Sequence, residues 1–444
     1  MAAPRIALLV HNRLENDPRV SRHGYAARRA GYRVAVLSVG AQHAGQARWG
    51  EAVDGIVVFE SRVIRVSLLG KLRRYVSKRS ARKAPTQSAV LASTNGAAHG
   101  VRRSVGIARA VQDVATIFML LRNNIGAFRQ FRGIGANLVH ANDLNVLFAG
   151  FLLARVWKAP LVYDSHELWT QLDEDWSPML RWLFGLLEGP LLRSADAVVT
   201  VNTLIAHELA RAYRAPLPIV VMNCPEVPAG EHSEQHPVPS DGGATAEVRL
   251  DHIQRGSQPL RVIYQGMLNY KGRGLEGLID AVSGLDGVEL TLRGPGDLAG
   301  PLQQRITKLG ASNVRIVPPV PMANLVQALH GYDVGVISYL PAGMNFQYCS
   351  PNKLFEYMMA GLAVVCSDLP VLREVVMSSE CGLLYEPGNA ESLAAALHEL
   401  VANPYALVTY KGNAWRTARE RYNAAEEEGK LLDLYERLLA GTMP

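Results

Sequence analysis

The sequence predicts an α/β protein with two doubly wound domains, each built on a parallel sheet. The chain has 444 residues, which is enough for two domains of ordinary size. Short apolar segments that suit buried strands alternate with helical patterns along most of it. Such alternation is typical of parallel sheets covered by helices on both faces. A segment dense in Pro, Gly and charge, residues 224–258, interrupts the alternation and predicts a domain boundary.

This boundary divides the chain into four regions. An N-terminal domain covers 1–223, and the linker at 224–258 separates it from a second domain at 259–405. The remaining residues, 406–444, carry a long amphipathic pattern and are expected to form C-terminal helices.

The first domain opens with strands predicted at 5–11, 33–39 and 55–63, with an irregular stretch before the third. Asp17 and Pro18 suit the N-cap and the first position of a helix that Gly31 ends. Further along, a helix broken near Gly189–Pro190 is expected, followed by strands at 196–202 and 218–223.

A basic segment, residues 64–134, breaks this rhythm. Between Ser61 and Asn142 there are 15 Lys or Arg residues and one acid, Asp113, so this part has a net charge of about +14. The formal net charge of the whole chain is +6, so the remaining residues sum to about −8. A run at 71–83 is especially basic, and a helix with a broad apolar face is predicted at 107–128.

Two interpretations of this basic segment are equally supported. It is either an acceptor-side excursion that touches an anionic membrane or substrate, or a solvated loop followed by a helix of the core. Nucleic acid is a poorer partner, because Tyr75 is the single aromatic residue in the first basic cluster.

Polar residues stand near the carboxyl ends of two further strands, predicted at 137–143 and 161–169. They are His140 and Asp143 in the first, and Asp164, His166 and Glu167 in the second. The loops beyond the carboxyl ends of parallel strands form the ligand crevice of open α/β sheets, so a site is favoured over a structural role. The acidic run at 173–175 lies in a polar loop and is expected to be solvated rather than to bind metal.

The second domain begins with a strand at 260–266 that ends in Gly266. Lys271 and Arg273 then stand beside the start of a helix, in a Gly-rich turn that suits phosphate binding but is a weak signal by itself. Further strands are predicted at 288–296, 314–320 and 332–341.

The most informative stretch is 350–374, "SPNKLFEYMMAGLAVVCSDLPVLRE". Ser350 suits a helix N-cap and Pro351 the first helical position, which places Asn352, Lys353 and Leu354 at a helix N-terminus. Free backbone N–H groups, the helix dipole and the lysine favour an anion such as a diphosphate there. Glu356 lies one turn further on, where its carboxylate can accept bonds from ribose hydroxyls. A plain capped helix is the alternative.

This stretch resembles the nucleotide-sugar signature of the retaining glycosyltransferases of family 4, which have the GT-B fold. In that family two glutamates are separated by seven residues, and Glu356 matches the second, which binds the ribose. Tyr348 stands where the first would contact the donor sugar. The resemblance implies two Rossmann-like domains facing a cleft, with a last helix that crosses back to the first domain.

The resemblance extends to other site residues. His166 matches the active-site histidine of similar enzymes, and Arg273 takes the position of a lysine that reaches the diphosphate. Met267 replaces the arginine of that loop. The sequence "DPRV" at 17–20 recurs in one branch of the family, but the usual Gly-Gly pair is missing, so the loop that ends at Asn16 would serve instead.

The resemblance implies a retaining glycosyltransferase that uses UDP- or GDP-sugars without a metal or other cofactor. Arg273, Lys353 and His166 are the expected catalytic residues, while Glu374 is expected to support the loop above the sugar. Polysaccharide, lipid-linked and small-metabolite acceptors all fit. Two other functions stay open: a nucleotide-sugar epimerase or phosphorylase of the same fold, and a degenerate subunit that binds a sugar nucleotide without turnover.

The start of the chain, "MAAPRIALLV", lacks the basic head and long apolar segment of a secretory signal. No run approaches the ~18 apolar residues of a membrane span. The four cysteines show no metal-ligand spacing and suit free thiols in a reducing compartment. A cytoplasmic protein is expected, with peripheral contact at the inner membrane face if the basic run at 71–83 binds lipid.

Overall fold

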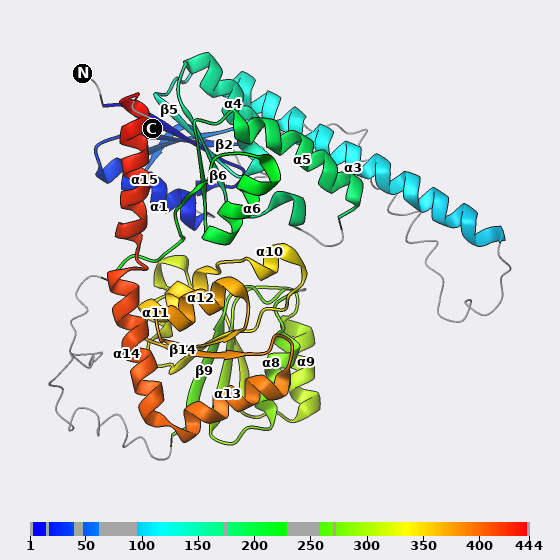
Figure 1. The fold of residues 1–444 in the computed structure, drawn as a ribbon, viewed down its shortest axis with the longest axis vertical. Coiled ribbons are helices and arrows are strands. Elements are labelled where there is room, and N and C mark those ends of the chain that lie inside the picture. The colour runs from blue at the N-terminus through cyan, green and yellow to red at the C-terminus, as the bar shows by residue number, and fades with distance from the viewer. Residues whose placement is uncertain are drawn as a thin grey trace. The chain divides into compact units, whose positions relative to one another are not determined.

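The computed structural model describes residues 3–14, 17–39, 48–61, 96–172, 176–228, 258–269 and 272–441. The chain forms two compact units (Figure 1). Unit 1 contains Met1–Thr200, His207–Ile219 and Leu432–Pro444, and unit 2 contains Val201–Ala206 and Val220–Leu431. The end of the chain therefore belongs to the first unit, as expected of a last helix that crosses back.

Unit 1 is built on an eight-stranded sheet with the order β3-β4-β2-β1-β5-β6-β7-β8. Its strands are β1 (Arg5–Val10), β2 (Arg33–Ser38), β3 (Trp49–Val53), β4 (Ile56–Glu60), β5 (Leu138–Asn142), β6 (Leu161–Ser165), β7 (Ala197–Thr200) and β8 (Ile219–Val220). The pairs from β4 through β7 are parallel, and the strand order reverses between β1 and β5, which creates a ligand crevice at that point.

The strand β3 corrects the expectation of an irregular stretch before the strand at 55–63. It pairs antiparallel with β4 at the edge of the sheet, with a register shift between Trp49 and Glu51. Its first four residues are exposed, so it carries no alternation of buried and exposed side chains from which a strand is predicted. β3 is a strand because its backbone pairs with β4, and its own sequence pattern does not predict one.

The helices of unit 1 are α1 (Pro18–Arg29), α3 (Gly96–Phe131), α4 (Leu144–Trp157) and α5 (Pro178–Arg193), with α6 (Thr203–Tyr213) from His207 onward and the end of α15 (Ala424–Leu439). The predicted helix at 107–128 is confirmed within α3, which packs against α4 and α5 (Figure 1). The basic run at 71–83 lies outside the described residues.

The expected break of α5 near Gly189–Pro190 is wrong, because the helix runs on to Arg193. Pro190 removes one backbone donor in the last turn, where little helix remains to be disrupted. Leu191 and Leu192, just beyond it, are buried in the core and hold the turn in place.

Unit 2 has a six-stranded parallel sheet with the order β11-β10-β9-β12-β13-β14. Its strands are β9 (Leu260–Gln265), β10 (Val288–Arg293), β11 (Val314–Val317), β12 (Val334–Ile337), β13 (Ala363–Ser367) and β14 (Gly382–Tyr385). This is the strand order of a Rossmann fold, and it reverses between β9 and β12.

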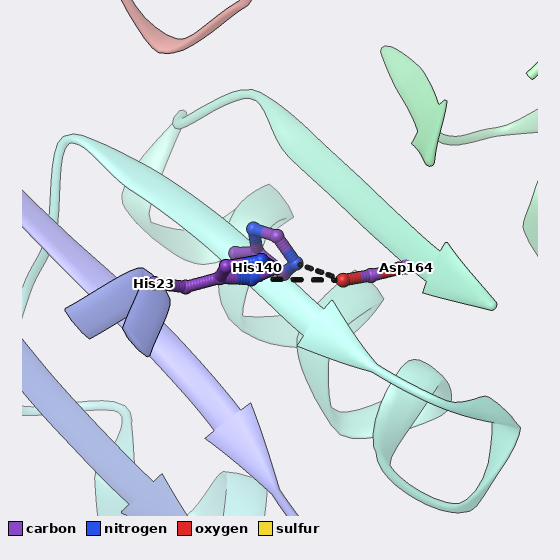
Figure 2. Close-up of side chains that lie close together, drawn as sticks. All are labelled: His23, His140 and Asp164. Carbon is purple, nitrogen blue, oxygen red and sulfur yellow. Dashed lines mark hydrogen bonds and ion pairs between the residues drawn. The ribbon is translucent and has the colours of Figure 1, made fainter. Parts of the chain in front are cut away.

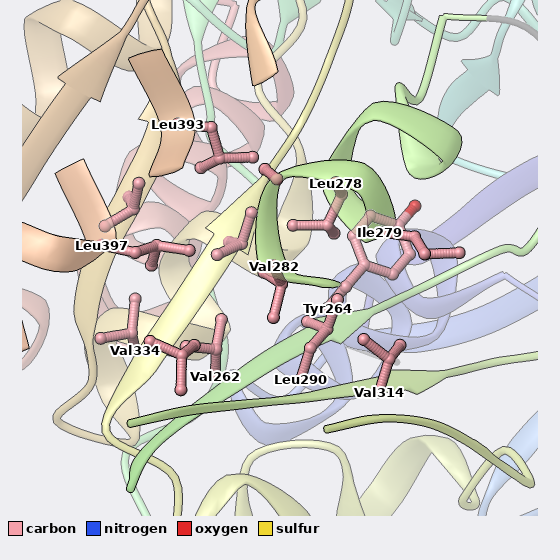
Figure 3. Packing of buried hydrophobic residues seen from close by; sticks show 14 of the residues in the cluster. Val262, Tyr264, Leu278, Ile279, Val282, Leu290, Val314, Val334, Leu393 and Leu397 are labelled. Atoms are coloured by element: carbon pink, nitrogen blue, oxygen red, sulfur yellow. The ribbon is translucent and has the colours of Figure 1, made fainter. Parts of the chain in front are cut away.

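Helices cover both faces of this second sheet. They are α8 (Leu275–Ser283), α9 (Ala299–Leu309), α10 (Gly343–Gln347), α11 (Asn352–Met359), α12 (Pro370–Ser378), α13 (Ala390–Ala402) and α14 (Pro404–Glu420). Figure 3 shows one core layer, in which Val262 and Leu290 of the strands pack with Ile279 of α8 and Leu397 of α13. A separate cluster buries α11 and α12 on other residues of the strands. Across both units, no helix among the described residues has the length and apolar character needed to span a bilayer.

Candidate active site

In unit 2, the candidate site lies where the strand order reverses, at the carboxyl ends of β9 and β12. The residue after β9 is Gly266, with φ +147°, a conformation that L side chains rarely adopt. A Cβ added there would lie 2.7 Å from Nζ of Lys353, the second residue of α11. Gly266 and Lys353 are therefore in direct contact, although 86 residues of sequence separate them.

The N-terminus of α11 begins one residue later than predicted. Pro351 is the N-cap, with φ −72° and ψ 133°, and no side chain caps the helix. The expected capping role of Ser350 is therefore wrong, because Pro351 is extended and places the serine outside the helix. Among the described residues, the buried Oγ of Ser350 has no hydrogen-bond partner, and Asn352 Oδ1 accepts a bond of 2.7 Å from Asn223 Nδ2.

The Lys353 side chain is buried, 6% exposed, and its ammonium has no hydrogen-bond partner in the described part of the chain. Its Nζ lies 3.6 Å from the ring centroid of Tyr264 and 5.4 Å from that of Tyr339. Burial, with the nearby Arg273 guanidinium, holds the pKa of Lys353 well below its usual value. A buried cation without an anion is costly, so this position favours a negatively charged ligand.

Arg273 is fixed beside this lysine. Its NH1 group donates to Tyr339 Oη at 2.6 Å, and its Nε donates to Asn269 Oδ1 at 3.0 Å. These neutral partners orient the guanidinium without neutralising it. Lys271, the other predicted cation of this loop, lies outside the described residues.

The remaining predicted site residues of unit 2 do not all lie beside Lys353. Glu356 is partly exposed, and its Oε2 accepts a bond of 3.3 Å from Gln265 at the end of β9. Leu354 is buried in the core and cannot offer its side chain to a ligand. Tyr348 follows α10, and Glu374 is exposed on α12. The structure thus brings Gly266, Arg273 and Lys353 together, but records no contact that joins Glu374 to them.

In unit 1, a second group of polar residues lies at the carboxyl ends of the neighbouring strands β5 and β6. Asp143 follows β5 with φ 70° and ψ 161°, an unusual backbone conformation for a non-glycine residue. Its Oδ1 accepts bonds from the His166 backbone N–H at 3.2 Å and the Trp169 indole at 3.3 Å. These bonds tie the loops after the two strands to each other.

The His166 imidazole lies between two carboxylates. Its Nδ1 is 3.2 Å from Asp143 Oδ2, and its Nε2 is 3.4 Å from Asp164 Oδ2. Burial lowers the pKa of His166, but Asp143 and Asp164 outweigh it and raise the pKa to about 10. His166 is therefore an imidazolium at neutral pH, with 17% of its side chain exposed.

Asp164 is fully buried and is the centre of this group. Arg19 of α1 donates to both of its oxygens, through Nε at 2.8 Å and NH2 at 2.9 Å. Burial opposes its ionisation, but Arg19 and His166 prevail and hold the pKa of Asp164 well below its usual value. The buried ion pair therefore keeps a negative charge beside His166.

Two more histidines approach the same carboxylate, as Figure 2 shows. His140 Nε2 is 3.3 Å and His23 Nδ1 3.8 Å from Asp164 Oδ2, and burial lowers the pKa of both histidines. Ligand atoms of His23, His140 and Asp164 lie within 4.8 Å of one another, close enough to hold a metal ion. The bidentate Arg19 opposes this use, because a divalent cation would face its guanidinium across one carboxylate.

His140 was predicted to face the substrates, but its side chain is fully buried and both ring nitrogens have partners. Nδ1 lies 2.7 Å from Tyr435 Oη, on α15, and Nε2 faces Asp164. Asn16 lies outside the described residues. Sequence reasoning assigned no role to Arg19, His23 or Tyr435. Arg19 had a signal, since it belongs to the "DPRV" segment, whereas Tyr435 stands 295 residues from its partner.

Comparison with known proteins matches both halves of the chain to glycosyltransferase families. Residues 18–225 match the "Glycosyl transferase 4-like domain" model, and residues 259–403 match the "Glycosyl transferases group 1" model. A phosphatidyl-myo-inositol mannosyltransferase of Mycobacterium tuberculosis is 30% identical over 301 residues, which are 65% of this chain and 68% of that protein. The same enzyme of Mycobacterium leprae is 29% identical and covers 64% of this chain and 79% of its own length.

Solved structures share the fold along the whole chain. Sucrose-phosphate synthase of Thermosynechococcus elongatus has a TM-score of 0.65 at 17% identity and covers 99% of this chain and 100% of its own. HepE of Anabaena gives 0.60 at 16% identity, with 98% and 99% covered. With the two Rossmann-like units and the family matches, these likenesses establish that the chain belongs to the group 1 glycosyltransferases, which have the GT-B fold.

Proposed function

We propose that this protein is a retaining glycosyltransferase that transfers a sugar from a UDP-sugar or GDP-sugar to a hydroxyl acceptor and releases UDP or GDP. The observation that carries the proposal is the buried, unpartnered ammonium of Lys353, close to the N-terminus of α11 and in contact with Gly266. A nucleoside diphosphate supplies the anion that this position lacks.

A nucleotide-sugar donor is also supported by relatives. HepE of Anabaena was solved with UDP and with UDP-glucose, and the two mycobacterial relatives described above are mannosyltransferases. Glu356 would bind the ribose hydroxyls, because its carboxylate is held by Gln265 one turn into α11. Tyr348, in the position of the family's first glutamate, would contact the donor sugar differently from most members.

Catalysis would depend on charge that develops as the donor bond breaks. Departure of the nucleotide builds negative charge on the β-phosphate oxygens. Lys353, Arg273 and the free N–H groups of α11 would stabilise that charge more strongly in the transition state than in the ground state. Bound phosphate would also raise the lowered pKa of Lys353 and so keep this group charged.

His166 would act as a charged hydrogen-bonding group rather than as a general base. With its pKa raised to about 10, the imidazole cannot accept a proton at neutral pH. Its position between Asp143 and Asp164 would hold the loop after β6 against the donor sugar or the acceptor. We assign no step to a metal ion, so chelators should leave the rate unchanged.

A lipid-linked or other anionic acceptor fits the charge of the first unit best. About +14 of charge lies between Ser61 and Asn142, and the α3 side chains Val111, Val114 and Phe118 are each about half exposed, at 47%, 56% and 56%. Basic and apolar side chains together suit the surface of an anionic membrane. Replacing the Lys and Arg residues of 71–83 with Gln should abolish binding to phosphatidylglycerol vesicles; a parent protein that does not bind them excludes membrane contact.

Incubation with a panel of UDP-, GDP-, TDP- and ADP-sugars tests the activity. Transfer, or slow hydrolysis of one donor, supports the transferase, and NMR of the glycosidic linkage in the transfer product should show the donor's anomeric configuration. An isomerised sugar nucleotide would identify an epimerase, and phosphate-dependent turnover a phosphorylase. Binding without turnover would identify a degenerate subunit.

Two substitutions separate the nucleotide half of the site from the chemistry. Glu356→Ala should weaken nucleotide binding by about tenfold or more, since a charge-assisted bond to the ribose is lost. His166→Ala should mainly lower kcat and leave the affinity for free nucleotide within about twofold. Unchanged nucleotide affinity in Glu356→Ala would remove the ribose assignment.

A further inference from the structure

We infer that Tyr435 of α15 is a positioning residue for His166, and that it acts by fixing the tautomer of His140. This inference rests on the proposed role of His166. The four side chains form a chain of contacts within unit 1, from Tyr435 through His140 and Asp164 to His166. Tyr435, the first of the four, is on the last helix, and His166, the last, is the only one of the four whose side chain is partly exposed.

The contacts of the chain are close and buried. Tyr435 Oη lies 2.7 Å from His140 Nδ1, and His140 Nε2 lies 3.3 Å from Asp164 Oδ2. The same Asp164 oxygen lies 3.4 Å from His166 Nε2. Tyr435, His140 and Asp164 are each 0% exposed, so water cannot substitute for a missing partner without a change in packing.

The direction of each hydrogen bond follows from the chemistry of the partners. Asp164 is ionised and can only accept, so the His140 nitrogen that faces it must carry the proton. Burial lowers the pKa of His140, which therefore carries a single proton, on Nε2. Its Nδ1 is then a bare acceptor, and Tyr435 must donate to it. Burial raises the pKa of the Tyr435 hydroxyl, which keeps this donor protonated.

The tautomer of His140 matters because several charged and titratable groups surround it and act on its pKa in opposite directions. Asp164 and Tyr435 face it from β6 and α15, Arg19 and His23 lie on α1, and His166 follows β6. Without the hydroxyl, Nδ1 would be a buried acceptor with no donor, and His140 would gain a proton more readily. A second imidazolium at Asp164 would compete with His166 for the same carboxylate and lower the pKa of His166.

The contact also explains why a buried tyrosine stands at this point of α15. Its ring meets the His140 ring edge-on at 5.8 Å between centroids and the Tyr32 ring at 6.4 Å. Phenylalanine would preserve both ring contacts and remove the oxygen alone. Tyr435→Phe is therefore a specific test, and Tyr32→Phe is a matched control, because Tyr32 touches the Tyr435 ring and lies outside the chain of contacts.

The test is ¹⁵N NMR of histidine-labelled full-length protein, with the His140 signals assigned by their loss in His140→Gln. The parent protein and Tyr32→Phe should show His140 as the neutral Nε2–H tautomer at pH 7. Tyr435→Phe should show a mixture of tautomers or an imidazolium, with the His140 pKa raised and the His166 pKa lowered. Turnover should fall about tenfold with an unchanged KM for the donor.

The spectra distinguish failure of this inference from failure of the proposed function, since they need no activity. An Nδ1–H tautomer or an imidazolium in the parent protein would overturn it. So would a Tyr435→Phe spectrum identical to that of the parent. If Tyr435→Phe fails to fold, pH titration of the parent decides alone: the inference requires His140 to stay neutral at Nδ1 down to below pH 6.5.

Discussion

At the scale of single residues, charge is distributed unequally between the two groups of polar side chains. Around Asp164, a carboxylate has a bidentate arginine and two close imidazoles, so its negative charge is well compensated. Around Lys353, a buried ammonium faces aromatic rings and has no hydrogen-bond partner among the residues that the structure describes. We interpret the first group as preorganised and the second as completed by a ligand.

Replacing Lys353 with Met tests this interpretation. Removing an uncompensated buried cation should leave the unliganded protein as stable as before or more stable, since methionine fills a similar volume with apolar atoms. Affinity for UDP or GDP should fall by about tenfold to a hundredfold, because a charge-assisted contact to phosphate is lost. Calorimetric titration and thermal melting measure the two effects.

Lys308→Met is the control for that substitution. Lys308 is exposed near the end of α9, in the same unit, and should change neither quantity by more than a small amount. A large loss of stability in Lys353→Met without loss of nucleotide affinity would contradict the account, because it would make the lysine a structural residue.

The raised pKa of His166 predicts a defined pH dependence. A histidine whose pKa is higher in the folded than in the unfolded protein stabilises the fold fully below about pH 6.5 and loses this contribution as the pH rises toward about 10. Asp143→Asn should lower the His166 pKa, since one of its two carboxylate partners becomes neutral.

NMR titration of the His166 ring measures this shift directly. The stability difference between Asp143→Asn and the parent should be largest near pH 6 and should shrink as the pH approaches 10. A His166 ring that titrates near pH 6.5 in the parent protein would show that the two carboxylates do not hold its proton.

At the scale of elements, the proposed nucleotide site of unit 2 depends on two segments that meet at Gly266. The loop after β9 needs a backbone with φ +147°, and a Cβ added at residue 266 would lie 2.7 Å from Lys353 Nζ. Glycine is required here by its backbone conformation, and any larger residue would also push the end of the Lys353 side chain aside.

Gly266→Ala should therefore displace Lys353 and weaken nucleotide binding, with some loss of stability from the strained φ. Gly277→Ala is a matched control in the same unit, because no atom lies within 4 Å of its Cβ position and the residue lies within α8. The control should stabilise the protein by about 0.5–1 kcal/mol and leave nucleotide affinity unchanged. Equal affinities in the two variants would separate Gly266 from the nucleotide site.

The elements that sequence predicted well are those with a strong local pattern. Capping at Asp17, confirmed by its bond to the Val20 N–H, and the buried run of β9 needed no information from the rest of the chain. The strand β3 and the continuous α5 were missed because pairing and packing with distant residues decide them. The start of α11 was shifted by one residue, since Ser350 and Pro351 each suit more than one position of a cap.

At the scale of the whole molecule, the sequence predicted two parallel-sheet units, and the structure confirms both. The boundary at 224–258 stays a prediction, which rests on the Pro- and Gly-rich composition of that segment. The grouping of residues from Leu432 onward with unit 1 followed from resemblance rather than from local pattern. The amphipathic pattern of a helix predicts that one face packs against a protein surface, but it does not predict which surface.

The same limit applies to the candidate sites. Lys353, Arg273, Asp143 and His166 could be chosen from the sequence because each stands at a helix start or just beyond a strand. Arg19 and Tyr435 could not, because their function depends on a partner 145 or 295 residues away. The sequence also did not predict how deeply each side chain is buried. His140 stands near a strand end in the sequence, yet its imidazole is fully buried.

The most direct test of the central claim, a site in unit 2 for a nucleoside diphosphate, is thermal melting of the parent protein with UDP, GDP, TDP and ADP. A ligand at a hundredfold excess over its Kd stabilises the protein by about 3 kcal/mol, which corresponds to a rise in Tm of about 6–12 °C for a unit of this size. We predict that UDP or GDP produces such a rise and that the matching nucleosides do not. No rise with any of the four diphosphates, at concentrations up to several millimolar, would contradict the account.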